Sequence, residues 1–306
     1  MAVTVAKKGV FTGTSGDDNI RVKGDSVVVN ANSGNDTVTL KRGNRNIIYA
    51  DSGDDRISFS KAAGSRNRAE GGYGDDTLVL NGGNKNRIYG NDGKDTFILN
   101  RTIGAGNNVY GGRGADTFVI NGGKAKNTDS WVSNTAYGNS GNDRSFLKAG
   151  RDYQLYGGAG KDYFKITGGV NNTLYGDAGN DTFEISGGGN DIIYCGGEND
   201  VVSGDSGDDT IYAGTGADML TGGTGRDVFC FGVAKDAKTV VCDYESGDVI
   251  RFLSNAVFDQ YSVSGSDVLL DYMGGTIQLS GARDKQVTYQ YADGNDGFIT
   301  KKVRFV

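Results

Sequence analysis

Residues 195–231 read CGGENDVVS GDSGDDTIY AGTGADMLT GGTGRDVFCF, from Cys195 to Phe231. The segment divides into four units of nine residues, and the last continues by one residue. Each unit places an aspartate at the end of a glycine-rich loop, and an apolar residue follows two positions later. The aspartates are Asp200, Asp209, Asp218 and Asp227, and the apolar residues are Val202, Ile211, Leu220 and Phe229. A short fixed period of this kind predicts a solenoid, in which each repeat packs on its neighbours.

The residue types of each unit suit a cation-binding loop followed by a strand. Glycine adopts φ > 0 without steric cost, so a glycine-rich loop can turn its carbonyl groups inward. Calcium prefers about six to eight oxygen ligands, which the carbonyls and carboxylates of such loops supply. The residues after the aspartate alternate between buried and exposed positions, as in a short strand. Each unit therefore predicts one calcium-binding loop and one strand.

The pattern G-G-x-G-x-D-x-U-x, in which U is a large apolar residue, is that of a calcium-binding nonapeptide. On this pattern the chain resembles the RTX (repeats-in-toxin) family. The segment 222–227 fits every defined position, whereas Cys195 and Glu198 depart from it in the first unit. The resemblance implies an all-β fold, a right-handed parallel β-helix (β-roll) solenoid. It also implies that two units make one coil turn and that Ca²⁺ is bound between loops of successive turns.

The same loop recurs upstream at about twice the spacing. Its closing aspartates are Asp18, Asp36, Asp55, Asp76, Asp95, Asp116, Asp143, Asp162 and Asp181, and the row continues through Asp200 and Asp218. Most steps are 18 to 21 residues, so each is predicted to be one coil turn with a single calcium loop. Apolar residues alternate after each loop, as in Phe97/Leu99, which indicates a strand. Ser145 interrupts this pattern after Asp143.

The other half of each turn carries asparagine where a calcium loop would carry aspartate. These residues are Asn46, Asn67, Asn86, Asn107, Asn134 and Asn172. A neutral amide does not balance a divalent ion, and stacked amides can hydrogen-bond as a ladder. We therefore expect this edge to be metal-free until aspartate returns at Asp191, Asp209 and Asp227. The predicted metal ligands are the aspartates of both rows.

A file of tyrosines follows the inward residue of that half-turn. Its members are Tyr49, Tyr89, Tyr110, Tyr137, Tyr156, Tyr175, Tyr194 and Tyr212, and Glu70 interrupts it. Alternation points these rings outward. Two interpretations stay open. The rings could stack and stiffen the sheet, or form an exposed stripe that contacts a glycan, a partner or another copy of the chain.

We expect three segments, namely an N-terminal strand or cap at 1–13, the β-roll at 14–231, and a C-terminal cap at 232–306. The last segment resembles the C-terminal flank of RTX proteins, which implies an uncleaved type I secretion signal. The residues that carry this resemblance are Asp243, Tyr244, Gly247, Asp248 and Ile250. An insertion before residue 137 holds Trp131, either as a contact point or folded back on the coil. Cys230 and Cys242 either pair or fill space.

Composition narrows the classes of function. The chain has no histidine, which excludes Ser-His-Asp and Cys-His catalysis and a histidine zinc site. A net charge of −6 disfavours nucleic acid as a partner. No run of 18 apolar residues predicts a transmembrane segment, and the first residues lack the apolar core of a cleaved signal peptide.

Taken together, these features predict a secreted, extracellular, calcium-binding structural protein and not an enzyme. It would serve in a surface layer, a matrix or a self-assembling filament. Residues 1–130 hold 18 Lys and Arg against 14 Asp and Glu, a net +4, which leaves −10 for the remainder. This asymmetry favours a head-to-tail homo-oligomer. The alternative is a glycan-binding or carbohydrate-active (lyase- or epimerase-like) β-helix that contacts a cell-surface or matrix polysaccharide.

Overall fold

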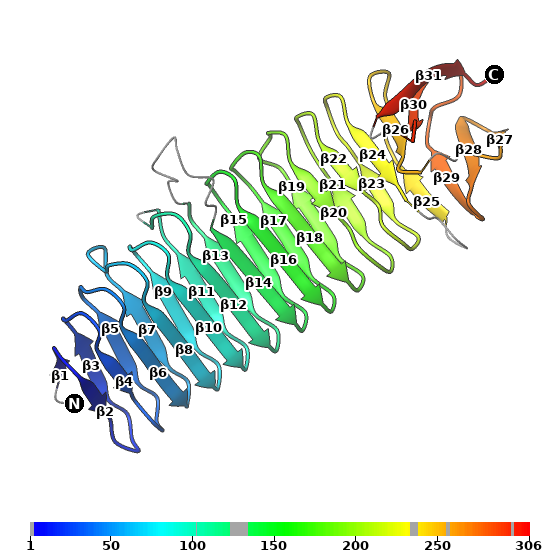
Figure 1. The fold of residues 1–306 in the computed structure, drawn as a ribbon. Coiled ribbons are helices and arrows are strands. Elements are labelled where there is room, and N and C mark those ends of the chain that lie inside the picture. Colours follow the sequence, from blue (N-terminus) through cyan, green and yellow to red (C-terminus); the bar gives the residue numbers. More distant parts are fainter. Residues whose placement is uncertain (1–2, 102, 123–133, 233–237, 255–257, 295–296) are drawn as a thin grey trace. The chain divides into compact units, whose positions relative to one another are not determined.

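The computed structural model describes residues 3–101, 103–122, 134–232, 238–254, 258–294 and 297–306. Their regular elements are all β-strands, which stack as successive rungs (Figure 1). Two compact units are formed, the first by Met1–Ala159 with Thr167–Gly169, and the second by Gly160–Ile166 with Val170–Val306. No helix that could cross a membrane is found in the part of the chain that the structure describes.

The first unit consists of two parallel sheets, and the chain alternates between them. One sheet contains β1 (Val3–Ala6), β3 (Asn19–Val22), β5 (Thr37–Leu40), β7 (Arg56–Phe59), β9 (Thr77–Leu80), β11 (Thr96–Leu99), β13 (Thr117–Ile120) and β15 (Arg144–Leu147), in that order. The other contains β2 (Val10–Thr12), β4 (Val28–Asn30), β6 (Ile47–Ser52), β8 (Arg68–Tyr73), β10 (Arg87–Asp92), β12 (Asn108–Arg113), β14 (Thr135–Ser140) and β16 (Gln154–Ala159). One strand of each sheet therefore makes one coil turn, as the repeat predicted.

The second unit also has two sheets, in which parallel strand pairing gives way to antiparallel pairing near the C-terminus. Its first sheet has the order β17 (Tyr163–Ile166), β19 (Thr182–Ile185), β21 (Val201–Ser203), β23 (Met219–Thr221), β25 (Lys238–Val241), β29 (Gly275–Leu279), β28 (Asp267–Tyr272) and β27 (Gln260–Ser264). Its second has the order β18 (Thr173–Ala178), β20 (Ile192–Tyr194), β22 (Thr210–Tyr212), β24 (Val228–Phe231), β26 (Val249–Phe252), β30 (Gln286–Ala292) and β31 (Phe298–Arg304). Antiparallel pairing begins only at the β28–β29 and β30–β31 pairs, so parallel pairing persists beyond residue 231.

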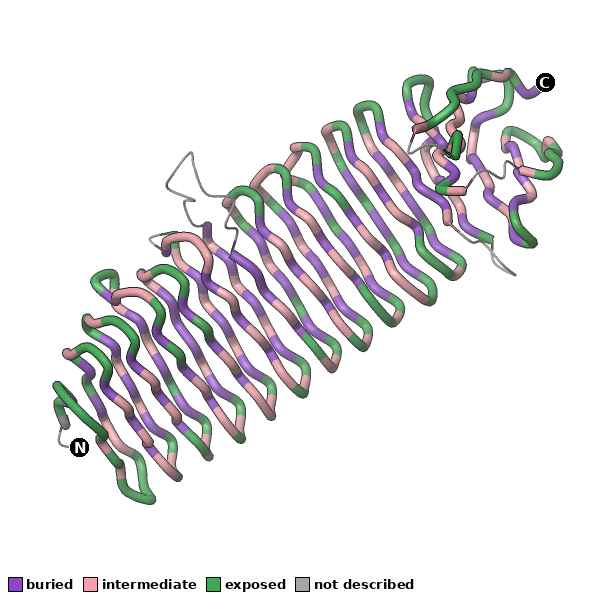
Figure 2. Tube along the Cα trace, viewed as in Figure 1, coloured by how far each residue is buried: buried purple, intermediate pink, exposed green. Residues whose placement is uncertain are grey.

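The core lies between the two sheets of each unit and is built by the predicted alternation. Figure 2 shows buried and less buried residues alternating along the strands. Phe97 and Leu99 are buried, and the register aligns Phe97 with Phe118 on the next rung. Those two rings stack with centroids 4.9 Å apart. Each such side chain contributes about 1.5–3 kcal/mol to stability on burial. Ser145, which breaks the apolar pattern, occupies an inward position and is buried as well.

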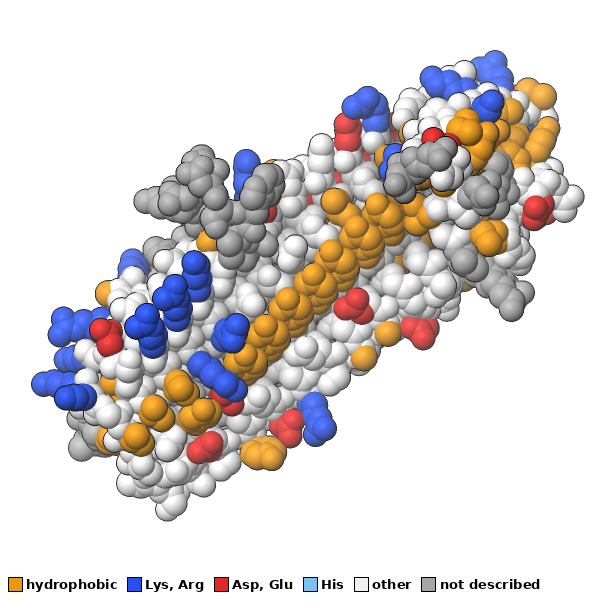
Figure 3. Space-filling model, in the orientation of Figure 1, with side chains coloured by type: hydrophobic (Ala, Val, Ile, Leu, Met, Phe, Trp, Pro, Cys, Tyr) orange, Lys and Arg blue, Asp and Glu red, His pale blue; other side chains and the backbone are white. Residues whose placement is uncertain are grey.

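The outward tyrosines stack on one another, as the first of the two interpretations predicts. Tyr110 lies between Tyr89 and Tyr137, with centroid distances of 4.8 Å on each side. In the second unit Tyr194 lies between Tyr175 and Tyr212, at 4.7 and 4.4 Å. The space-filling view shows a file of apolar side chains on this face (Figure 3). In-register parallel pairing sets the ring spacing, because adjacent strands lie about 4.8 Å apart.

The segments that flank the repeats are joined to the coil by backbone hydrogen bonds. Strands β1 and β2 pair in parallel with β3 and β4, so the N-terminal segment adds one more rung. At the other end the Asp243 carboxylate accepts the backbone N–H groups of Gly222 and Gly223, at 3.0 and 2.7 Å. Cys230 and Cys242 are free thiols and do not pair. Trp131 and residues 123–133 lie outside the described residues.

Candidate metal centre

The predicted aspartates of the first unit form a continuous hydrogen-bonded ladder along one edge of the coil. The backbone N–H of each aspartate donates to Oδ1 of the aspartate one rung further on. The distances are 2.7 Å for Asp36 to Asp55, 2.8 Å for Asp55 to Asp76, and 2.8 Å for Asp76 to Asp95. The ladder begins at Asp18 and runs on through Asp116 to Asp143. We refer to this row and its counterpart in the second unit as the first aspartate row.

The second unit carries two such rows, one at each edge. The first aspartate row comprises Asp162, Asp181, Asp200 and Asp218, joined in the same way at 2.7–3.0 Å. On the opposite edge the N–H of Asn172 donates to Asp191, which donates to Asp209 and that in turn to Asp227. These last three form the second aspartate row. The structure thus places every predicted site residue in one of the two rows.

Asparagines form a ladder of the same geometry in the first unit, with one additional bond per rung. The N–H of Asn67 donates to Oδ1 of Asn86 at 2.9 Å, and its side-chain Nδ2 donates to the same oxygen at 3.1 Å. Asn46, Asn86 and Asn107 repeat this arrangement with their own neighbours. The side-chain amides of Asn46, Asn67, Asn86 and Asn107 thus all donate within the ladder, as the sequence predicted.

Aspartate has no such donor, so the same geometry leaves one oxygen of many of these carboxylates without a partner. Within the described ranges these buried Oδ2 atoms belong to Asp36, Asp55, Asp76, Asp95, Asp116, Asp181, Asp191, Asp200, Asp209 and Asp227. A buried polar atom left unsatisfied costs about 1–3 kcal/mol, and more when it is charged. A column of such atoms is therefore unstable unless cations or protons lie beside it.

The ends of the rows differ, because the protein itself supplies a donor there. Thr14 donates to Oδ2 of Asp18 from its backbone N–H at 2.6 Å and from its hydroxyl at 3.0 Å. Thr239 donates to Oδ2 of Asp218 at 3.3 Å. Asp248 ends the second aspartate row, where it accepts the N–H groups of Asp227 and Glu245. Asp18 and Asp218 were predicted as metal ligands, but their carboxylates are satisfied by the chain.

Glycines lie beside many of these oxygens, namely those of Asp76, Asp95, Asp116, Asp181, Asp209 and Asp227. Ala31, Ala50 and Cys195 hold the equivalent place before Asp36, Asp55 and Asp200. A Cβ placed on Gly204 would lie 2.7 Å from Oδ2 of Asp209 and 2.6 Å from the carbonyl oxygen of Gly222. A Cβ on Gly90 would collide with Oδ2 of Asp95 in the same way. At these glycine rungs a carboxylate and a backbone carbonyl thus face one cradle, which an added Cβ would fill. This explains the glycine that follows the tyrosine in most of these turns.

Burial of the rows changes the acidity of their carboxyl groups. Burial raises the pKa of Asp76 to about 8. The hydrogen bond from the N–H of Asp55 opposes this rise, and the neighbouring carboxylates of Asp95 and Asp55 add to it. The same causes raise the pKa of Asp181 to about 8 and of Asp209 to about 7. In the absence of a cation, a large fraction of these groups would therefore be protonated near neutral pH.

The donor set suits a hard cation. The cradle offers carboxylate and backbone carbonyl oxygens, which are the ligands that calcium prefers. Among the described residues, no three Asp, Glu, His or Cys side chains meet in one cluster. Carbonyl oxygens of the loops would therefore have to complete the coordination around each aspartate. The sites fit calcium better than zinc, which prefers nitrogen and sulfur ligands.

Sequence reasoning missed a second, exposed ladder beside the first aspartate row. Oδ1 of Asn35 accepts the N–H of Asp54 at 3.0 Å, and Oδ1 of Asp54 accepts the N–H of Asp75 at 2.9 Å. In the second unit Asn180 and Asn199 are joined likewise. This ladder could have been found from the sequence, because an Asp or Asn directly precedes the closing aspartate in many loops. These side chains order the loop from outside, and the aspartates among them add negative charge near the cradle.

No curated protein is significantly similar in sequence. Among solved structures, the chain is similar to a hyperactive, Ca²⁺-dependent, beta-helical antifreeze protein from an Antarctic bacterium. The TM-score is 0.49 at 16% identity, over 81% of this chain and 78% of that chain. The model of the RTX calcium-binding nonapeptide repeat (4 copies) matches residues 12–47, 70–101, 133–154, 166–202 and 194–229, which make up half of the chain. The chain therefore belongs to the RTX calcium-binding nonapeptide repeat family.

Proposed function

We propose that this calcium-binding solenoid is a secreted structural protein whose folding is triggered by extracellular calcium. It would serve in a surface layer, an extracellular matrix or a filament. The observation that carries the proposal is the column of buried carboxylate oxygens without a donor, as at Asp76 and Asp95. Such a column is tolerable in the folded state only when cations or protons neutralise it, and at the pH of most extracellular fluids cations are the effective partner.

In this proposal the two aspartate rows hold the ions, and the Asn46–Asn134 ladder holds none. Calcium supplies the positive charge that the rows lack. The glycine cradles, as at Gly204, supply the space, and the carbonyls beside them supply further ligands. Because the ligands are brought together only by stacking of the rungs, binding and folding are coupled.

Calcium dependence fits a protein that works outside the cell. Extracellular calcium modules bind with Kd values of about 10⁻⁴–10⁻³ M, so at cytosolic calcium levels the chain would stay unfolded. An unfolded chain is the form that a narrow secretion channel can pass. The RTX-like residues of the C-terminal flank, Asp243 to Ile250, support a type I route.

Contacts between copies would use the terminal strands. Val5 of β1 is 39% exposed, and Phe298 of β31 is 43% exposed. Both belong to edge strands, which offer unpaired backbone groups to another chain. However, β31 carries Lys301, Lys302 and Arg304, and Lys7 follows β1 directly. These like charges oppose a direct β31-to-β1 contact, so the acidity of the whole C-terminal part does not by itself favour head-to-tail assembly.

The alternative, a glycan-binding tyrosine stripe, finds less support. A sugar ring packs on the face of an aromatic side chain, and both faces of Tyr110 are covered by its neighbours. The outer face of Tyr89 meets the guanidinium of Arg68, 5.1 Å from the ring centroid. A ring stacked on both sides, such as Tyr110, presents only its edge to solvent, which favours a stiffening role for the file.

Folding and assembly can be tested in one titration. Purified protein is taken from chelator through micromolar to millimolar calcium while far-UV circular dichroism and light scattering are recorded. The proposal expects folding with a midpoint well above micromolar calcium. A midpoint below micromolar calcium would contradict an extracellular trigger. A protein that folds and then stays monomeric at high concentration would contradict the filament role alone.

A further inference from the structure

The first unit carries a cluster of exposed cations on its asparagine edge. The cluster consists of Arg45, Arg66, Arg68, Lys85 and Arg87, and we call it the basic patch. Its side chains line a cavity of about 520 Å³ together with Ile47 and Asn67. Lysine and arginine side chains gather near the start of the tyrosine file in the space-filling view (Figure 3).

The backbone holds these cations in rows. Arg45, Arg66 and Lys85 occupy equivalent loop positions with φ of 55°, 60° and 53°. The N–H of Arg45 donates to Ser65, that of Arg66 to Asn84, and that of Lys85 to Ala105, each at 3.1 Å. On the adjoining strands Arg68 and Arg87 are register partners. The rows therefore repeat at about the 4.8 Å spacing of parallel strands.

Little negative charge compensates the patch. Arg68 forms an ion pair with Glu70 and lies over the Tyr89 ring. Arg45, Arg66, Lys85 and Arg87 form no ion pair with any residue that the structure describes. Asp25 lines a neighbouring cavity together with Arg45 and Arg66, and its carboxylate accepts the N–H of Asn44 at 2.7 Å. Like charges on adjacent rungs repel one another, so binding of an external anion would stabilise the patch.

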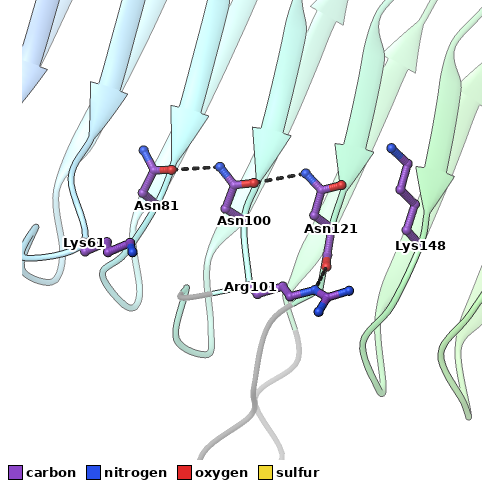
Figure 4. A pocket seen from close by; sticks show the side chains of 6 residues that line it. All are labelled: Lys61, Asn81, Asn100, Arg101, Asn121 and Lys148. Carbon is purple, nitrogen blue, oxygen red and sulfur yellow. Dashed lines mark hydrogen bonds between the residues drawn. The ribbon is translucent and has the colours of Figure 1, made fainter.

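A second cavity extends this chemistry along the same edge. It measures about 460 Å³ and is lined by Lys61, Asn81, Asn100, Arg101, Asn121 and Lys148 (Figure 4). Its amides form a ladder in which Asn100 donates to Asn81 at 2.8 Å and Asn121 donates to Asn100 at 3.0 Å. The loop between β7 and β8 carries both Lys61 and Arg66, so it borders both cavities. Cations thus recur over several rungs, with amides between them that can hydrogen-bond hydroxyl groups.

We propose that the asparagine edge of the first unit binds an acidic polysaccharide, with the basic patch as its principal contact. An extended sugar chain carries a negative group and several hydroxyls at regular intervals, which matches rows of cations interleaved with amides. A single-stranded nucleic acid would need free aromatic faces for its bases, and the rings of Tyr89 to Tyr137 cover one another. This inference goes beyond the structural role and does not depend on it.

The test compares two variants with the same change in net charge. In the patch variant, Arg45, Arg66, Lys85 and Arg87 are each replaced by glutamine. In the control, four exposed cations of the second unit are replaced, as Arg283→Gln, Lys301→Gln, Lys302→Gln and Arg304→Gln. Circular dichroism in millimolar calcium first establishes that both fold. Binding of hyaluronate and of chondroitin sulfate is then measured by isothermal titration calorimetry, with neutral dextran as the uncharged probe.

We expect the wild type and the control to bind both acidic polymers and not dextran. The patch variant should bind at least about tenfold more weakly, because four exposed charge contacts are removed. Binding should also weaken as salt is raised from about 0.05 to 0.3 M. The smaller variant Lys85→Gln/Arg87→Gln should show an intermediate loss.

Four results would overturn the inference. They are failure of the folded wild type to bind either acidic polymer, unchanged affinity in the patch variant, equal loss in the control, and preferential binding of a poly-dT oligonucleotide. The last result would assign the patch to nucleic acid. None of them bears on calcium-dependent folding, which the same samples report independently by circular dichroism.

Discussion

The backbone N–H of Asp76 donates to Oδ1 of Asp95 at 2.8 Å, while Oδ2 of Asp76 meets no donor among the described residues. On the opposite edge the corresponding atom is Nδ2 of Asn67, which donates to Asn86 at 3.1 Å. The two edges share one backbone geometry and differ in a single side-chain atom. That atom decides which edge requires a cation.

Replacement of one residue on each edge should separate calcium binding from stability. Asp95→Ala should lower the number of calcium ions bound, because it removes a carboxylate from the first aspartate row. Asn86→Ala should leave that number unchanged. It should lower the free energy of unfolding by about 1–3 kcal/mol, since the donors of Asn67 lose their acceptor. Calorimetric titration gives the ion count and urea unfolding at fixed calcium gives the stability. Equal calcium loss in both variants would show that the edges are assigned wrongly.

The glycine cradle should be intolerant of a methyl group. Gly90→Ala places a Cβ against Oδ2 of Asp95. The methyl group would fill the space in which that oxygen contacts the ion. We expect a lower ion count and a loss of about 1–3 kcal/mol from overpacking. Gly16→Ala is the matched control, because a Cβ there meets nothing within 4 Å. Thermal unfolding at fixed calcium compares the two, and similar midpoints would argue against the cradle.

Acid should partly replace calcium. Burial raises the pKa of Asp76 and of Asp116 to about 8 in the calcium-free fold, from an ordinary value of 3.8. Because the folded pKa lies above the unfolded one, the fold binds extra protons between these values. Its stability therefore increases as pH falls from about 8 towards 4, and is lost as pH rises through the folded pKa.

Two measurements check this pH dependence. In chelator, the β-sheet signal in circular dichroism should grow on acidification from about pH 8 to 5. Calcium affinity should fall over the same interval, because protons compete for the carboxylates. An affinity independent of pH across this range would mean that the buried carboxyl groups are not the ligands.

The stacked tyrosines should matter to stability and not to calcium binding. Tyr110→Leu removes two ring contacts and should cost about 1–3 kcal/mol. Tyr49→Leu should cost less, since Glu70 occupies the next rung and no described ring stacks on Tyr49. Urea unfolding at fixed calcium distinguishes them. Equal losses would mean that burial of the side chain, and not stacking, is what counts.

Much of this architecture could be predicted because the repeat carries it locally. The closing aspartates, the inward residues such as Phe97 and the asparagine ladder all follow from a period that is visible in the chain. The donors that satisfy the carboxylates at the ends of the aspartate rows could not be predicted. Thr239 takes the ladder position after Asp218, where its hydroxyl accepts the N–H of Asp218. No glycine-rich loop precedes Thr239, so the repeat pattern does not indicate this role. The basic patch was missed too, because Arg45, Arg66 and Lys85 come together only through stacking of loops.

The central claim is that cations between the rungs hold the coil together. Its most direct test is far-UV circular dichroism at about pH 7.5, first in excess chelator and then in millimolar calcium, with magnesium as the control cation. The account predicts a disordered spectrum in chelator, a β-sheet spectrum in calcium, and little recovery in magnesium. A β-sheet spectrum that is the same in chelator and in calcium would contradict it.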